Sequence, residues 1–161
     1  MEQKKEQPLQ AIWIAQSIVD EAVAMLDNSK GNMFFRVRAV ANVIVGELAV
    51  CDIEATENQF IYPDGSLIYS EDYDLTSKEI SYENVIMAFL YHINQEAVKA
   101  GVLPDPMTGK VGNIDAGTMI ECSNEISKTK GRFTLKAFAD GDITTAGPVR
   151  IRMEVVPRDD D

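Results

Sequence analysis

The side chains of this sequence that could do chemistry are few. His92 is the only histidine, and one imidazole is too few for a histidine-based zinc site. A catalytic triad would need an activated serine or cysteine in a recognisable elbow, and the sequence has none. We therefore expect His92 to be a packed or boundary residue. No catalytic residue is predicted, and the balance leans away from an enzyme.

Two fragments of ligand-binding motifs occur in one loop and fail on inspection. Gly109 and Lys110 follow Pro104 where a phosphate loop has its first glycine, and Val111 stands where Ser or Thr would bind magnesium. Residues 105–115 lack the regular aspartate ladder of an EF-hand. The sequence predicts neither a nucleotide site nor a calcium site here.

An acidic segment precedes the second predicted helix and contains Glu71, Asp72 and Asp74. Their oxygens could hold a divalent cation. A solvated loop that stabilises the N-terminus of the next helix explains the same residues more simply. No metal and no cofactor are predicted.

Basic residues recur at alternating positions along three predicted strands. Side chains two or four residues apart on a strand project from the same face of the sheet. The candidate partner-binding or anion-binding set consists of Arg36, Arg38, Arg132, Lys136, Arg150 and Arg152. Without these six, nine basic residues stand against 26 acidic ones, a balance of −17 in place of −11. If the three strands share one sheet, they form a basic surface on an acidic molecule.

Three roles are open for that surface. The basic side chains could pair with carboxylates of the same chain, such as Glu47, Asp52, Glu54 and Glu154. They could pair with acids of another subunit, or bind a phosphate-rich or carboxylate ligand. In an enzyme, Glu47 or Asp52 would act as the acid or base, because apolar surroundings raise the pKa of a carboxylate.

Length and composition indicate one folded domain over residues 1–161. The chain has 161 residues, a mass of 17.8 kDa and 45% hydrophobic residues, enough for a core without disulfides. Cys51 and Cys122 have apolar neighbours and are expected to be buried free thiols.

The net charge and the N-terminal sequence bear on partners and location. A pI near 4.5 argues against direct nucleic-acid binding. The first residues lack a signal-peptide core and no apolar run could span a membrane, so a cytoplasmic location is expected.

In the first half of the chain, periodicity predicts a helix and then strands. Residues 1–7 and 158–161 are polar and are expected to fray. A helical stripe covers residues 8–28. Residues 33–53 alternate with period two except at Glu47, beside Gly46, which predicts one bent strand or two strands meeting there.

The second half of the chain starts with a turn signal. Pro63, Asp64 and Gly65 predict a hairpin over residues 59–69. A capping-box pattern at Thr76–Glu79 introduces a helix over residues 78–100.

A loop over residues 101–113 and a third helix over residues 114–130 follow. Two amphipathic strands, 132–139 and 149–155, close the chain as an antiparallel pair. The predicted class is α+β, an antiparallel sheet packed with about three helices.

These features favour a non-catalytic acidic protein that works through protein contacts. We expect a homo-oligomer, or a component or regulator of a larger assembly. The first alternative is a protein or enzyme that binds a small anion on the arginine-rich face. The second is an acidic mimic of nucleic acid that inhibits a partner.

Overall fold

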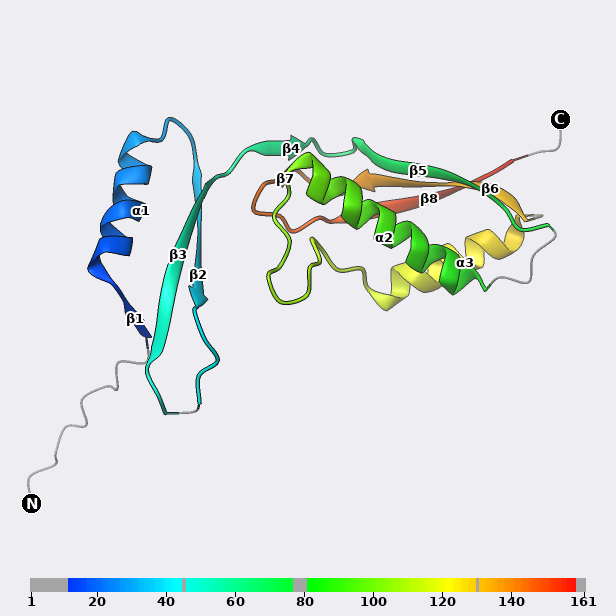
Figure 1. Ribbon diagram of the computed structural model, residues 1–161. Helices are drawn as coiled ribbons and strands as arrows, with labels where there is room; N and C mark the ends of the chain where they lie inside the picture. Colours follow the sequence, from blue (N-terminus) through cyan, green and yellow to red (C-terminus); the bar gives the residue numbers. More distant parts are fainter. Residues whose placement is uncertain (1–11, 45, 77–80, 130, 159–161) are drawn as a thin grey trace, which may run out of the picture. The chain divides into compact units, whose positions relative to one another are not determined.

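The computed structural model describes residues 12–44, 46–76, 81–129 and 131–158 (Figure 1). The predicted α+β class is confirmed, with three helices and mainly antiparallel strands. The chain comprises two compact units, Met1–Asn58 and Gln59–Asp161, here called unit 1 and unit 2. The domain boundaries from the sequence stay a prediction. The predicted tails at 1–7 and 158–161 lie outside the described residues, apart from Arg158.

The described residues of unit 1 form a three-stranded sheet and one helix. Its elements are β1 (Ile12–Ile14), α1 (Gln16–Asn28), β2 (Met33–Ala39) and β3 (Ala49–Glu57). The strand order is β1-β3-β2, with β1 parallel and β2 antiparallel to β3.

The predicted helix over residues 8–28 is wrong at its start. Ile12, Trp13 and Ile14 form backbone pairs with β3, and their bulky side chains suit a strand as well as a helix. Residues 8–11 lie outside the described part of the chain.

The period-two pattern of residues 33–53 is confirmed as two strands. β2 ends at Ala39 and β3 begins at Ala49. Between them Gly46 has φ 94°, a conformation that glycine adopts without a Cβ penalty. Glu47, which breaks the alternation, lies in this turn and is exposed.

Unit 2 contains two sheets and two helices. β5 (Leu67–Asp74), β6 (Arg132–Ala139) and β8 (Ile151–Pro157) form an antiparallel sheet with β6 in the middle. β4 (Phe60–Tyr62) pairs with β7 (Ile143–Thr144). α2 (Tyr82–Ala100) and α3 (Ala116–Lys128) contact each other and the larger sheet (Figure 1).

The turn predicted at Pro63–Gly65 is present, but the hairpin is wrong. Gly65 has φ 72°, and the Ser66 amide donates to the Pro63 carbonyl over 3.1 Å. The flanking strands β4 and β5 pair with β7 and β6, not with each other.

The predicted acidic loop is also wrong, because Glu71, Asp72 and Asp74 belong to β5. There they form a ladder with β6. Of the predicted capping box, residues 77–79 lie outside the described chain. The side chain of Ser81 caps α2 by accepting from the Asn84 amide.

The core of unit 2 lies between its helices and the larger sheet. Every second residue of β6 is buried, as the alternation of a half-covered strand requires. The cluster comprises Val85, Ile86, Phe89, Ile93, Cys122, Ile126, Phe133, Leu135 and Ala137. Cys51 and Cys122 are both buried free thiols, as expected.

Candidate functional site

The six predicted basic residues lie on two different sheets. Arg36 and Arg38 belong to β2 in unit 1, whereas Arg132, Lys136 and Arg152 belong to the larger sheet of unit 2. Arg150 immediately precedes β8. One shared sheet was therefore a wrong expectation. Its physical reason is that β6 pairs with β5 on one edge and β8 on the other, which leaves no edge for β2.

On β2 the arginines stand opposite carboxylates of the same sheet. Arg36 is in register with Glu54, and Arg38 with Asp52. The Arg36 guanidinium also lies 5.5 Å from the centre of the Phe34 ring, within the range of a cation–π contact. The cross-strand pairing expected for Asp52 and Glu54 is thus geometrically available within unit 1.

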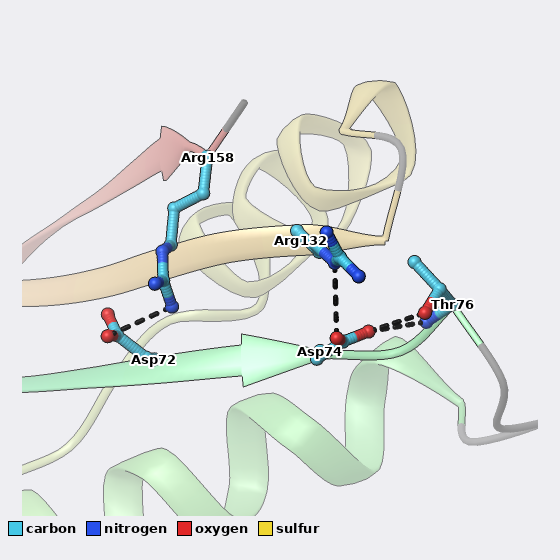
Figure 2. A network of polar contacts seen from close by, with 5 residues as sticks. All are labelled: Asp72, Asp74, Thr76, Arg132 and Arg158. Atoms are coloured by element: carbon cyan, nitrogen blue, oxygen red, sulfur yellow. Dashed lines mark hydrogen bonds and ion pairs between the residues drawn. The ribbon is translucent and has the colours of Figure 1, made fainter. Parts of the chain in front are cut away.

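The solvent-facing side of the unit 2 sheet carries an ionic network (Figure 2). Arg132 Nε lies 3.1 Å from Asp74 Oδ2, and Thr76 donates to Asp74 through its hydroxyl at 2.6 Å and its amide at 3.1 Å. The Thr76 hydrogen bonds, with the Arg132 charge, hold the pKa of Asp74 below its ordinary value. Arg132 therefore pairs with a carboxylate of its own unit.

A second ion pair ties the end of β8 to the same face. Arg158 Nη1 lies 3.0 Å from Asp72 Oδ2, reaching across β6 (Figure 2). The Thr134 hydroxyl donates to the other Asp72 oxygen over 2.6 Å. The Arg158 amide also donates to the carbonyl of Arg132. Arg158, expected in a frayed tail, is held by both contacts.

The other basic residues of this face also have neighbours in the sheet. Lys136 is in register with Glu154 and Ser70, and the Arg152 guanidinium lies 5.9 Å from the Phe138 ring centre. The face is a mixed ladder of acids and bases. Binding of a partner or an anion by the six residues stays a prediction.

A cluster that the sequence did not reveal joins β5 to α2. Glu71 Oε2 accepts from the Tyr73 hydroxyl at 2.7 Å and contacts His92 Nδ1 at 2.9 Å. The Tyr69 hydroxyl lies 3.4 Å from the same nitrogen. The period-two spacing of Tyr69, Glu71 and Tyr73 was the available signal, because it places all three on the helix-covered face. His92 is a boundary residue, as predicted.

Electrostatics in this cluster favour an ionised Glu71. Partial burial acts to raise the pKa of Glu71, but hydrogen bonds from Tyr73 and His92 outweigh it and hold that pKa below its ordinary value. Burial and the same carboxylate raise the pKa of Tyr73 and of Tyr69. The cluster fixes the orientation of the His92 imidazole, a group that can serve as a general acid or base.

Cys122 carries the buried thiol of unit 2, and this thiol is not activated as a nucleophile. Burial, with the charge of Glu125, raises the pKa of the Cys122 thiol to about 11. A protonated thiol is a weak nucleophile, and Cys122 packs in the core. Among the described residues no group of three or more His, Cys, Asp or Glu could hold a metal ion.

Unit 1 exposes large apolar side chains at high density between residues 35 and 48. Phe35 is 38% exposed, Val37 54% and Ile44 71%. We name this group the unit 1 apolar surface: Phe35, Val37, Val40, Val43, Ile44 and Leu48. Phe35 and Val37 share one face of β2, and β2 is an edge strand of its sheet. The signal in the sequence was the apolar register itself, which predicted a buried face.

A family model described as the DUF3084-associated C-terminal helical hairpin matches residues 68–161, more than half of the chain. The chain belongs to this family. No curated protein and no solved structure matches it.

The matched residues include α2 and α3, which contact each other. The connection between them runs over residues 101–115, two residues longer than the predicted 101–113 loop, because α3 begins at Ala116 and not at residue 114. Gly101 ends α2 with φ 110°. Unit 1 lies outside the matched residues. No helix in the described part of the chain is long and apolar enough to cross a membrane, and the cytoplasmic location stays a prediction.

Proposed function

We propose that this member of the DUF3084-associated helical hairpin family is a non-catalytic contact protein that self-associates through the unit 1 apolar surface. One observation carries the proposal. In residues 12–44 and 46–58, Cys51 is the only buried side chain, at 6% exposure. A unit with so small a core of its own gains stability by covering its apolar side chains with another surface.

The energetic argument follows from side-chain size. Fully burying a Val, Leu, Ile or Phe side chain stabilises by about 1.5–3 kcal/mol. In the single chain Val37 and Ile44 are more than half exposed, and Phe35 is 38% exposed. Covering even a few of them would supply a substantial part of the free energy of a protein interface.

A second copy of the chain is the occupant that the charges favour. The arginines of β2 are in register with Glu54 and Asp52, so the polar face of the unit has its opposite charges built in. An apolar surface is complementary to itself across a two-fold axis, which is the commonest symmetry of oligomers. Association by this surface needs no oppositely charged partner.

The family name adds a second support. It describes a C-terminal part that accompanies another domain. A contact-bearing part of a larger assembly is compatible with that description. Self-association through unit 1 would then bring two copies of the C-terminal part close together.

Light scattering coupled to size-exclusion chromatography of the full chain tests the proposal. The wild type should elute with twice the 17.8 kDa mass. Phe35→Asp and Ile44→Asp should each yield the single-chain mass, and Ile44 lies in a connection where the change does not disturb strand pairing. Phe60→Asp is the matched control, because Phe60 is 58% exposed on a strand of unit 2.

Salt separates this proposal from pairing of arginines with acids of another copy. Raising the salt concentration weakens contacts between exposed charges, whereas apolar contacts persist or strengthen. A wild-type chain of single mass would contradict the proposal. So would dissociation by salt, or equal dissociation of the Phe60→Asp control.

A further inference from the structure

A cavity in unit 2 lies between α2, the 101–113 loop, the start of α3 and β8. Its volume is about 590 Å³, within the range of small-molecule sites. Leu90, Ile93, Met119, Val149 and Ile151 supply much of its apolar wall. Met87 and Tyr91, both largely exposed, also line it. The cavity is therefore apolar inside and accessible from solvent.

The charge of the lining is the unusual feature. The chain has 26 Asp and Glu, yet no carboxylate lines the cavity, and Lys110 is its one charged side chain within the described residues. In that part of the chain Lys110 makes no ion pair. The nearby Asp105 carboxylate accepts from Thr108 and from the Met107 amide, which engages it within its own turn.

The loop that forms one wall is fixed before any ligand arrives. The Asn94 side chain donates to the Gly109 carbonyl at 3.3 Å and accepts from the Val111 amide at 2.9 Å. The Val149 amide donates to the Val111 carbonyl at 2.8 Å. At Gly112 a Cβ would collide with the Val149 carbonyl, so a glycine is needed for this approach. A preformed wall avoids the ordering cost of binding.

We propose that this cavity binds a small amphipathic monoanion, with an apolar chain in the cavity and a carboxylate at Lys110. The apolar wall would contact the hydrocarbon part of the ligand, and the ammonium of Lys110 would bind its carboxylate. A cationic ligand would meet the ammonium without any carboxylate to oppose it. Lys110 is exposed to solvent, so a neutral ligand would gain nothing from its charge.

The site differs from the arginine-rich face that the sequence suggested for anions. It uses the 101–113 loop and a lysine, and none of Arg132, Arg150 or Arg152 lines the cavity. It is also independent of the unit 1 apolar surface. Failure of self-association leaves this proposal intact, and the reverse holds as well.

Titration calorimetry of the full chain with octanoate, octanol and octylammonium tests the head-group preference. Octanoate should bind the most tightly of the three. Lys110→Gln should weaken octanoate binding about tenfold, the size of a charge-assisted hydrogen bond at a partly exposed site, and leave octanol binding unchanged. Lys99→Gln is the matched control, because Lys99 is an exposed lysine on α2 outside the lining.

Amide chemical shifts locate the bound octanoate. The largest shifts should fall on residues 108–114 and on Met119. Equal affinity for the three probes would overturn the proposal, as would absence of octanoate binding. Equal losses of octanoate affinity in Lys110→Gln and Lys99→Gln would also overturn it, as would chemical-shift changes confined to residues outside the cavity.

Discussion

Unit 1 and unit 2 differ in how far their large apolar side chains are buried. In unit 2, Phe133 and Phe89 are completely buried between the helices and the sheet, whereas in unit 1 the aromatic ring of Phe35 is 38% exposed on β2. Both units have strands with period-two apolar alternation. Apolar alternation along a strand therefore predicts that one face is covered, but it does not say whether the same chain or another molecule covers that face.

The two units also differ in how they use charge. Unit 2 fastens three strands with Arg132–Asp74 and Arg158–Asp72, and a further cluster joins Glu71 to His92. Such pairs add little energy at a surface, and the core supplies the stability of unit 2. In the described residues of unit 1 only Cys51 is buried, and our proposal assigns the larger contribution there to a contact with a second copy.

The largest expected effect contrasts two phenylalanine truncations. Phe133→Ala should lower the free energy of unfolding by about 3–5 kcal/mol, because it leaves a cavity in a packed core. Phe35→Ala should cost under about 1 kcal/mol in the single chain and instead weaken self-association. Urea unfolding followed by circular dichroism measures both. Equal losses in the two variants under dissociating conditions would remove the contrast between the units.

The next effect concerns the dependence of stability on protein concentration. Trp13 in β1 is the only tryptophan, so its fluorescence reports on unit 1. The unfolding midpoint that it reports should rise with protein concentration, and the apparent free energy of unfolding should increase by about 1.4 kcal/mol of dimer per tenfold increase, because association binds only the folded form. The absorbance of the partly buried tyrosines of unit 2, such as Tyr69 and Tyr73, should show a smaller dependence on concentration. A Trp13 transition independent of concentration would contradict coupling of unit 1 to self-association.

A smaller effect concerns Glu71 and pH. The folded-state pKa of Glu71 lies below its ordinary value of 4.5. Its contribution is therefore fully present above pH 4.5 and is lost as the pH falls through the lower, folded-state pKa. Glu71→Gln should remove a few tenths to about 1 kcal/mol at neutral pH and flatten the acid limb of the stability profile. Parallel profiles for wild type and variant between neutral and acidic pH would show that the cluster contributes nothing.

The smallest effect is expected for the exposed ion pairs. Arg132→Ala and Arg158→Ala should each cost under about 1 kcal/mol in thermal unfolding. Neither should change the mass in light scattering, since both pairs lie within unit 2. Loss of the dimer in either variant would shift the contact surface to the arginine-rich face.

Much of the local structure could be predicted from residue patterns. The turn at Pro63–Gly65, the end of the second helix at Gly101 and the alternation of β6 each follow from one or two residues with strong backbone or burial preferences. The antiparallel pairing of the last two predicted strands is confirmed in β6 and β8, but the pairing of β4 and β5 could not be predicted this way. β4 and β5 flank a good turn, yet β5 pairs with β6 because the helices that follow return the chain to that edge.

The candidate sites were harder to predict for the same reason. Charge spacing within a strand places Arg132 and Lys136 on one face, but the partner strand decides whether Asp74 lies beside them. The Glu71–His92 contact joins residues on two elements, and the cavity depends on a loop fixed by Asn94. Such contacts depend on tertiary packing that a linear pattern does not encode.

Hydrogen–deuterium exchange of the full chain, below and above the dissociation constant for self-association, tests the central claim most directly. Amides of residues 33–44 in unit 1 should become more protected at the higher concentration, while those of residues 133–139 in unit 2 stay the same. Protection of residues 33–44 that does not change with concentration, in a chain that still forms a dimer, would contradict the account.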